Sequence, residues 1–265
     1  MKKIALPIFM ALFFILGVIG YGYPCTGVAY IDDEKTIVWI NFDRPEPEVA
    51  FFCEVKPFLC HRVKGFSRDP KLREEWISHG MNEHGFAILT QSPPNEEKCP
   101  NRKYYRPAGD WLKTFKTVDE ALAEIEKKKG FYLISPLFRI LADRNKIALI
   151  EAFSPENYKI VTLQKGVLTH TNHYTFPELS HFNEKLNAKP GNLAFSEKRL
   201  RIANDFLEKK EKTVEAFKEL SLVSNVGNKM TIANIIFYIS HNDEKPKVIY
   251  RFPKPQDKDW VEVGF

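Results

Sequence analysis

Hydrophobic and polar positions along this chain alternate in many short runs, a pattern that is typical of β-strands. Runs rich in β-branched and aromatic residues at 26–31 and 36–42 are separated by the polar residues 32–35, and together they predict a hairpin. Similar runs predict further strands, which lie at residues 85–91, 138–142, 146–153, 158–163 and 167–171. Two last strands are predicted at 231–240 and 248–252, on either side of a polar turn.

Three other segments have helical patterns. Thr117 and Glu120 form a capping box ahead of a helix predicted over residues 121–128. Apolar residues recur at helical spacing over 196–209, and a shorter helix is predicted over 213–220. Because strands come first and last with helices between them, the pattern predicts an α+β fold in which helices cover sheets.

The N-terminal segment differs from the rest of the chain in its pattern of charged and apolar residues. Lys2 and Lys3 precede an apolar run over residues 4–20, which is the pattern of a secretory signal. Gly20 and Gly22 are small residues that suit a signal peptidase. The pattern therefore predicts that the chain is exported.

We expect residues 1–24 to be a signal peptide with a pro-segment, and residues 25–265 to form one domain, secreted or periplasmic after cleavage. The alternative is an uncleaved N-terminal anchor. Its apolar run of seventeen residues lies near the roughly 20 that span a bilayer, so a membrane would be a partner only in that case.

Charge and composition narrow the classes of partner. The formal net charge of +5 is spread over mixed-sign segments such as residues 208–212, which is typical of a solvated surface rather than of a nucleic-acid interface. The sequence has no glycine-rich phosphate loop, so nucleotides are not favoured. His170 and His173 would face opposite sides of a strand-like segment, so neither a metal nor another cofactor is predicted.

The cysteines single out one residue. Cys25 directly follows the predicted pro-segment, so cleavage there would give one residue both a thiol and a free α-amine. Cys53, Cys60 and Cys99 are an odd set, of which one pair at most can form a disulfide after export. Cys53 and Cys60 are the nearest candidates, and their spacing is poor for zinc.

Five short segments, taken in order, resemble one protein family. They are Cys25-Thr26-Gly27, Asn41-Phe42-Asp43, Gly80-Met81-Asn82-Glu83-His84-Gly85, Thr171-Asn172-His173-Tyr174 and Ser196-Glu197-Lys198-Arg199. The set is similar to the linear-amide C–N hydrolases, N-terminal-nucleophile (Ntn) enzymes that include choloylglycine hydrolase, penicillin V acylase and the isopenicillin-N acyltransferase-like peptidases. The resemblance implies a four-layer αββα sandwich of two stacked antiparallel sheets, with Cys25 at the start of an inner strand.

The resemblance also implies a set of site residues. Attack on an amide carbonyl needs a nucleophile, a base and donors for the oxyanion. Cys25 would supply the sulfur, and its free α-amine, with an ordinary pKa of about 7.7–8.0, would be the base. Asp43, eighteen residues later, matches the family aspartate that orients the nucleophile. Asn172 matches the asparagine that stabilises the oxyanion.

Other positions depart from the family pattern. Ile40 replaces an arginine of the bile salt hydrolases, so bile salts are not expected as substrates. Ser92 stands near the place of a second family asparagine and is a weaker candidate for oxyanion support. Asn41 is expected to support the nearby turn rather than catalysis. The family also has a catalytic arginine late in its sequence. We assign that role neither to Arg251 nor to Lys229.

Several residues are also expected to have structural roles. Asn82 and Glu83 are expected to form a turn, and His79 and His84 are expected to lie in loops. Aromatic residues in loop-like segments could build an acyl pocket, and they are Phe51, Phe52, Phe58, Tyr104 and Tyr105.

The expected function is that of an exported N-terminal-cysteine amidohydrolase, which cleaves a small acylated amide through an acyl-enzyme. One alternative is acyl transfer by the same site. Another is a catalytically silent protein that binds an acylated ligand or is tethered to a membrane, because Pro24 would block maturation. Nucleic acid is not an expected partner, and a homo-oligomer is compatible with the sequence.

Overall fold

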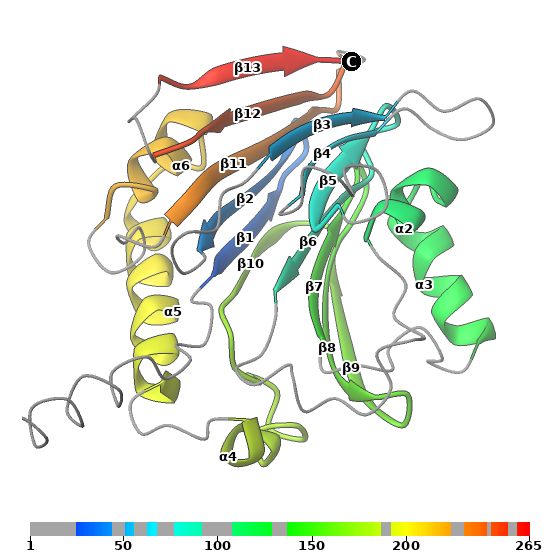
Figure 1. Ribbon diagram of the computed structural model, residues 1–265, viewed down its shortest axis with the longest axis vertical. Coiled ribbons are helices and arrows are strands. Elements are labelled where there is room, and N and C mark those ends of the chain that lie inside the picture. The colour runs from blue at the N-terminus through cyan, green and yellow to red at the C-terminus, as the bar shows by residue number, and fades with distance from the viewer. Residues whose placement is uncertain are drawn as a thin grey trace, which may run out of the picture.

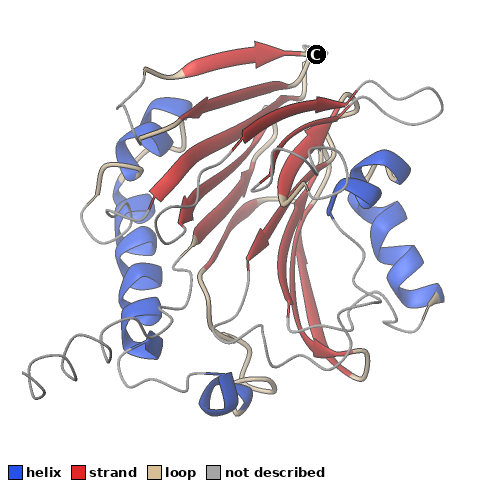
Figure 2. Cartoon of the chain, viewed as in Figure 1, coloured by secondary structure: helices blue, strands red, loops and turns tan. Residues whose placement is uncertain are grey.

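Two antiparallel sheets, stacked face to face, form the centre of the molecule. A computed structural model describes residues 25–43, 51–55, 63–67, 77–91, 108–128, 137–186, 192–223, 231–242, 245–253 and 259–265. Strands occupy the two inner layers and helices the two outer ones (Figures 1 and 2). The predicted α+β class and the αββα sandwich are confirmed.

The first sheet has six strands and contains both ends of the described chain. Its order is β10 (Gly166–His170), β1 (Thr26–Ile31), β2 (Lys35–Asp43), β11 (Thr231–Ser240), β12 (Lys247–Arg251) and β13 (Val261–Gly264). β1 and β2 form the predicted hairpin, in which the Asp32 carboxylate accepts hydrogen bonds from the backbone N–H groups of Glu34 and Lys35. This turn therefore sets the register of the two central strands.

The second sheet has seven strands that follow one another in chain order. They are β3 (Phe51–Val55), β4 (Val63–Ser67), β5 (His79–Asn82), β6 (Ala87–Gln91), β7 (Leu137–Ala142), β8 (Ile147–Ser154) and β9 (Asn157–Leu163). Each strand pairs with the next, as consecutive strands usually do, although residues 92–136 separate β6 from β7.

Both faces of the first sheet are buried, which explains why its central strands are apolar at almost every position. In β2, Val38 and Ile40 pack against the second sheet, whereas Ile37 and Trp39 pack against helices. The Trp39 indole N–H donates to the Ser221 hydroxyl at 2.9 Å, which satisfies the polar edge of this buried ring.

Helices cover the two outer faces (Figure 1). α5 (Asn192–Lys209) and α6 (Val214–Leu220) lie on the first sheet, and α2 (Ala108–Thr114) and α3 (Val118–Lys127) on the second, while α4 (Phe182–Leu186) lies apart from both pairs. The predicted cap of α3 is present, since the Thr117 hydroxyl accepts a hydrogen bond from Glu120 N–H. α5 begins before the predicted start, at Asn192.

The segment around Asn82 is partly strand, contrary to the prediction of a turn alone. Its backbone pairs with β4 and β6, and His79 is buried against the Phe42 ring rather than lying in a loop. Asn82 ends β5 and does form the turn, because its side-chain oxygen accepts from the N–H groups of His84 and Phe86. Gly85 completes the turn with a φ of 82°, which glycine adopts without strain.

Several predictions concern residues that the structure does not describe. Residues 1–24, Ser92, Cys60 and Cys99 lie outside the described ranges, and Cys53 lies in β3 without a described side chain. Within the described ranges, no helix is long and apolar enough to cross a membrane.

Candidate active site

Cys25 lies immediately before β1, at the end of a strand in the middle of the first sheet. Its thiol is fully buried, and its side chain packs in the apolar core between the two sheets. The sulfur lies 3.8 Å from the main-chain oxygen of Asp43, the last residue of β2. The spacing of eighteen residues is therefore the spacing of the hairpin, which brings Cys25 and Asp43 together.

Asp43 is fixed by the strand on its other side. Its carboxylate accepts a 2.5 Å hydrogen bond from the Thr231 hydroxyl, at the start of β11. The pairing of β11 with β2 shifts register between Thr231 and Ala233, a bulge that places Thr231 opposite Asp43. The described contact with Cys25 is made by the main chain of Asp43, and the carboxylate is held by Thr231.

Asn172 lies in the irregular segment that follows β10. Its backbone N–H donates to the Ser196 hydroxyl at 3.0 Å, and its side-chain oxygen accepts from Arg199 Nη2 at 3.0 Å. Because this bond takes up the oxygen, the Nδ2 group that can donate is directed away from Arg199. The hydrogen bond from Arg199 thus fixes the orientation of the Asn172 amide.

Arg199 joins the two predicted residues, although no site role was predicted for it. Its Nη1 donates to the main-chain oxygen of Cys25 at 2.6 Å and to the Thr26 hydroxyl at 2.8 Å, while Nη2 holds Asn172. Burial lowers the pKa of Arg199 to about 10, and the negative charges of Asp43 and Cys25 oppose this shift. The guanidinium therefore stays protonated at neutral pH.

A signal for Arg199 is present in the sequence. The buried residues of α5 are Ser196, Arg199, Ala203 and Leu207, at helical spacing. An arginine in the buried stripe of an otherwise polar helix needs polar partners inside the fold. The helical spacing of these residues could have predicted that Arg199 is buried, but it could not have predicted which residues Arg199 contacts.

The weaker candidate Asn41 belongs to a separate chain of hydrogen bonds. Asn234 Nδ2 donates to the Asn41 side-chain oxygen, and Arg251 Nε donates to the Asn234 oxygen at 2.9 Å. These three residues lie on neighbouring strands β2, β11 and β12. The contacts favour a structural role for Asn41, across neighbouring strands rather than in the turn that was predicted.

His170 and His173 bracket Asn172 but have different partners. The His170 ring faces Gln91 and Glu151, whereas His173 Nδ1 lies 2.9 Å from the Ser196 hydroxyl. In the part of the chain that the structure describes, no group of three or more His, Cys, Asp or Glu side chains could hold a metal ion.

The free energy of unfolding is expected to fall between pH 7 and pH 4.5 because of His173. Burial, together with the charges of His170 and Arg199 and against the charge of Glu151, lowers the pKa of the His173 ring from 6.5 to about 4. The unfolded chain therefore binds a proton below about pH 6.5 that the folded chain binds only near pH 4. Denaturant titrations at both pH values should show a loss of about 2 kcal/mol that is absent in His173→Asn.

The exposed His181 provides the matched control. His181→Asn should keep the pH dependence of the wild type. If His173→Asn keeps it too, the neutral state assigned to the His173 ring is wrong.

Comparisons with known proteins found a family model and solved structures that match this chain. Residues 76–234 match the family model described as acyl-coenzyme A:6-aminopenicillanic acid acyl-transferase. Asn172 and Arg199 lie inside the matched range, and Cys25 and Asp43 precede it. No curated protein sequence matches the chain significantly.

Two solved structures share the fold. Penicillin V acylase from Agrobacterium tumefaciens is 18% identical with a TM-score of 0.53, and the alignment covers 91% of this chain and 86% of that one. A Caenorhabditis elegans orthologue of N-acylethanolamine-hydrolyzing acid amidase is 15% identical with a TM-score of 0.54, over 80% and 92% of the two chains. At these identities the likeness concerns the fold.

Proposed function

Because the chain belongs to the acyl-coenzyme A:6-aminopenicillanic acid acyl-transferase family, we propose that it is an N-terminal-cysteine amidohydrolase that cleaves a linear amide. One observation carries the proposal. Arg199 contacts both the main chain of Cys25 and the side chain of Asn172, so a nucleophile and an oxyanion donor are held by one buried cation. Such a pairing is what acyl transfer to a thiol requires.

The reaction begins with maturation of the chain. Cleavage of the bond between Pro24 and Cys25 releases the α-amine, which takes the proton of the thiol as the sulfur attacks the substrate carbonyl. Nδ2 of Asn172 donates to the oxyanion of the tetrahedral intermediate. The amine then returns the proton to the leaving nitrogen, the C–N bond breaks, and a thioester on Cys25 remains.

Water completes the cycle by the same route. The α-amine takes a proton from the attacking water, a second tetrahedral intermediate forms at the thioester, and the thiol leaves with that proton. The carboxylic acid is released and Cys25 is restored. An amine in place of water would give a new amide, which is the acyltransferase alternative.

Arg199 supports this chemistry in two ways. It fixes the main chain of Cys25 and the orientation of the Asn172 amide at the same time. The attraction between its charge and that of the Cys25 sulfur is mutual, so the guanidinium also favours the thiolate. These contacts are made through a fully buried side chain, where little water screens them.

The surroundings of Cys25 favour an apolar acyl group. The cluster that contains Cys25 also includes Phe42, Ile232 and Phe66, and Phe52 packs against it. Phe52 is the predicted pocket residue with a described side chain, and its ring stacks on Tyr250 at 4.9 Å. Both structurally similar enzymes are named for small acylated amides, which supports this substrate class.

A substrate panel tests the proposed function. The mature protein should release amine and carboxylic acid in equal amounts from at least one compound among penicillin V, N-acylethanolamines, N-acyl amino acids and N-acyl homoserine lactones. An added amine acceptor that diverts the acid into a new amide would favour acyl transfer. Binding of these compounds without turnover by a chain that starts at Cys25 would favour the silent binding protein.

We also propose that the protein acts outside the cytoplasm after removal of residues 1–24. The charged and apolar pattern of that segment supports export. The alternative, an anchor that is never cleaved, is incompatible with a free amine on Cys25.

A further inference from the structure

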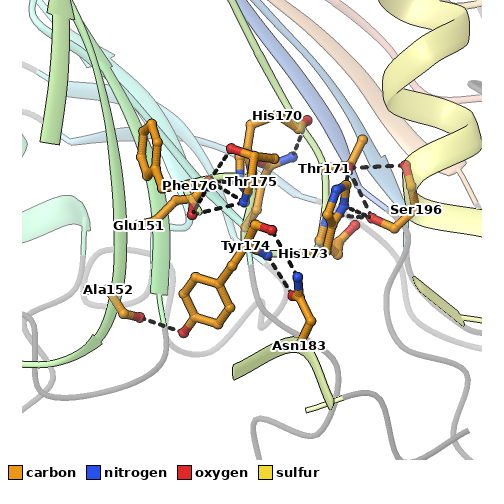
Figure 3. Close-up of polar contacts among 12 residues, drawn as sticks. Glu151, Ala152, His170, Thr171, His173, Tyr174, Thr175, Phe176, Asn183 and Ser196 are labelled. Atoms are coloured by element: carbon orange, nitrogen blue, oxygen red, sulfur yellow. Dashed lines mark hydrogen bonds and ion pairs between the residues drawn. The ribbon is translucent and has the colours of Figure 1, made fainter. Parts of the chain in front are cut away.

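Two fully buried charged groups face each other across the two sheets, next to the segment that carries Asn172. Glu151 belongs to β8 of the second sheet, and His170 ends β10 of the first. Glu151 Oε1 lies 3.2 Å from His170 Nε2. Figure 3 draws both residues among their polar contacts. The proposed mechanism uses neither side chain, so burial of this pair needs another reason.

The hydrogen bonds around His170 define its protonation state. Gln91 Nε2 donates to the main-chain oxygen of His170 at 3.1 Å, which orients the Gln91 amide. Its Oε1 then faces His170 Nδ1 at 2.9 Å, and an amide oxygen can only accept. On the other side the Glu151 carboxylate also accepts, so both ring nitrogens donate and the ring is an imidazolium.

The carboxylate of Glu151 remains ionised in this environment. Burial alone would raise the pKa of Glu151, but the hydrogen bond and charge of His170, with hydrogen bonds from Thr175, hold that pKa below its usual value. The His173 ring, beside Asn172, feels the charges of His170 and Glu151 and that of Arg199 on α5. Glu151 therefore faces the His170 ring as a carboxylate.

The same carboxylate also binds the far end of the Asn172 segment, which we define as residues 170–176. Glu151 accepts hydrogen bonds from Thr175 N–H at 2.8 Å, from the Thr175 hydroxyl, and from Phe176 N–H at 3.3 Å (Figure 3). Since His170 is the first residue of the segment, Glu151 holds both of its ends. Asn172 lies between these two anchors.

Gly27 lies in β1, the strand that begins after Cys25, and its lack of a side chain leaves room for the residues around His170. It lies opposite His170 in the pairing of β1 with β10. A Cβ atom at Gly27 would stand 3.4 Å from Gln91 Nε2 and 3.3 Å from the Leu89 and Ile140 side chains. His170 and its partner Gln91 therefore lie directly against the strand that begins after Cys25.

We propose that Glu151 and His170 are positioning residues, a buried ion pair that fixes both ends of the Asn172 segment and so directs the Asn172 amide at the oxyanion. This inference rests on the proposed role of Asn172. Misplacement of a reacting group by about 1 Å can cost roughly 100-fold in rate, so even a small relaxation of the segment should affect turnover.

Glu151→Gln tests the proposal because it keeps the shape of the side chain and removes its charge. We expect kcat per titrated active site to fall roughly 10- to 100-fold with KM changed less than about twofold. The exposed Glu178, which pairs with Lys159, provides the control, and Glu178→Gln should keep the wild-type kcat. Thr175→Val keeps the charge and removes one anchoring hydroxyl, so it should give a smaller loss of kcat and serves if Glu151→Gln does not fold.

A second readout does not depend on turnover. The ¹⁵N signals of the His170 ring should show two protonated nitrogens at neutral pH in the wild type. A neutral His170 ring in the wild type would overturn the ion pair, whether or not any amide is cleaved.

Kinetics separate the remaining outcomes. If the wild type turns over its substrate while Glu151→Gln and Thr175→Val both keep wild-type kcat per active site, the positioning role is wrong and the proposed function stands. A lower melting temperature with unchanged kcat would likewise reduce the pair to a purely structural role. If the wild type cleaves no amide, the proposed function fails, and the positioning role fails with it.

Discussion

Cys25→Ala is expected to abolish amide hydrolysis, with a fall in kcat of at least about 10⁴-fold, because no thioester can form without the sulfur. The side chain is fully buried, so removal of its sulfur should leave a small cavity that costs about 1 kcal/mol of stability, too little to explain the loss of activity by unfolding. Both chains should be compared with residue 25 at the N-terminus, so that loss of maturation is not mistaken for loss of catalysis.

The matched experiment for this prediction is labelling by a thiol-directed acyl probe. Cys25→Ser should lose the label while keeping the wild-type melting temperature within a few degrees. Labelling confined to Cys53, Cys60 or Cys99 in the wild type would place the nucleophile elsewhere. Full activity of Cys25→Ala would have the same meaning.

Asn172→Asp is expected to lower kcat by roughly 10²- to 10³-fold, the usual effect of removing one oxyanion donor. Aspartate keeps the oxygen that accepts from Arg199, so the site should remain folded while the Nδ2 donor is lost. KM should change little, because the hydrogen bond is made to the oxyanion rather than to the ground-state carbonyl. Steady-state kinetics on the amide found in the panel measure both constants.

Asn204 is the control for the Asn172 prediction, since it is exposed on α5. Asn204→Asp makes the same chemical change and should keep kcat within about twofold. If Asn172→Asp also keeps its kcat, the oxyanion must be held by another donor.

Much of the first sheet could be predicted from local pattern. Residues 26–31 and 231–240 coincide with β1 and β11, and the Thr117 cap of α3 was predicted from a two-residue signature. The elements that were missed are short. β5 (His79–Asn82) contains a glycine and an asparagine, and its strand conformation depends on pairing with β4 and β6, which no local pattern reveals.

The site shows the same division between local and distant contacts. Cys25 and Asp43 meet because a hairpin joins them, so their spacing was informative. Arg199 reaches Cys25 from a helix far along the chain, and Glu151 meets His170 across two different sheets. Such pairings follow from the stacking of the layers, and the residue types alone do not predict them.

Cys25 is proposed to be both the N-terminal residue and the nucleophile of the mature protein. Peptide mass analysis of the protein, quenched in acid during turnover of its amide substrate, tests both roles at once. We expect an acyl group on a peptide that begins with Cys25. A mature chain that still begins at Tyr23 or earlier, or an acyl group found on Cys53, Cys60 or Cys99, would overturn these roles.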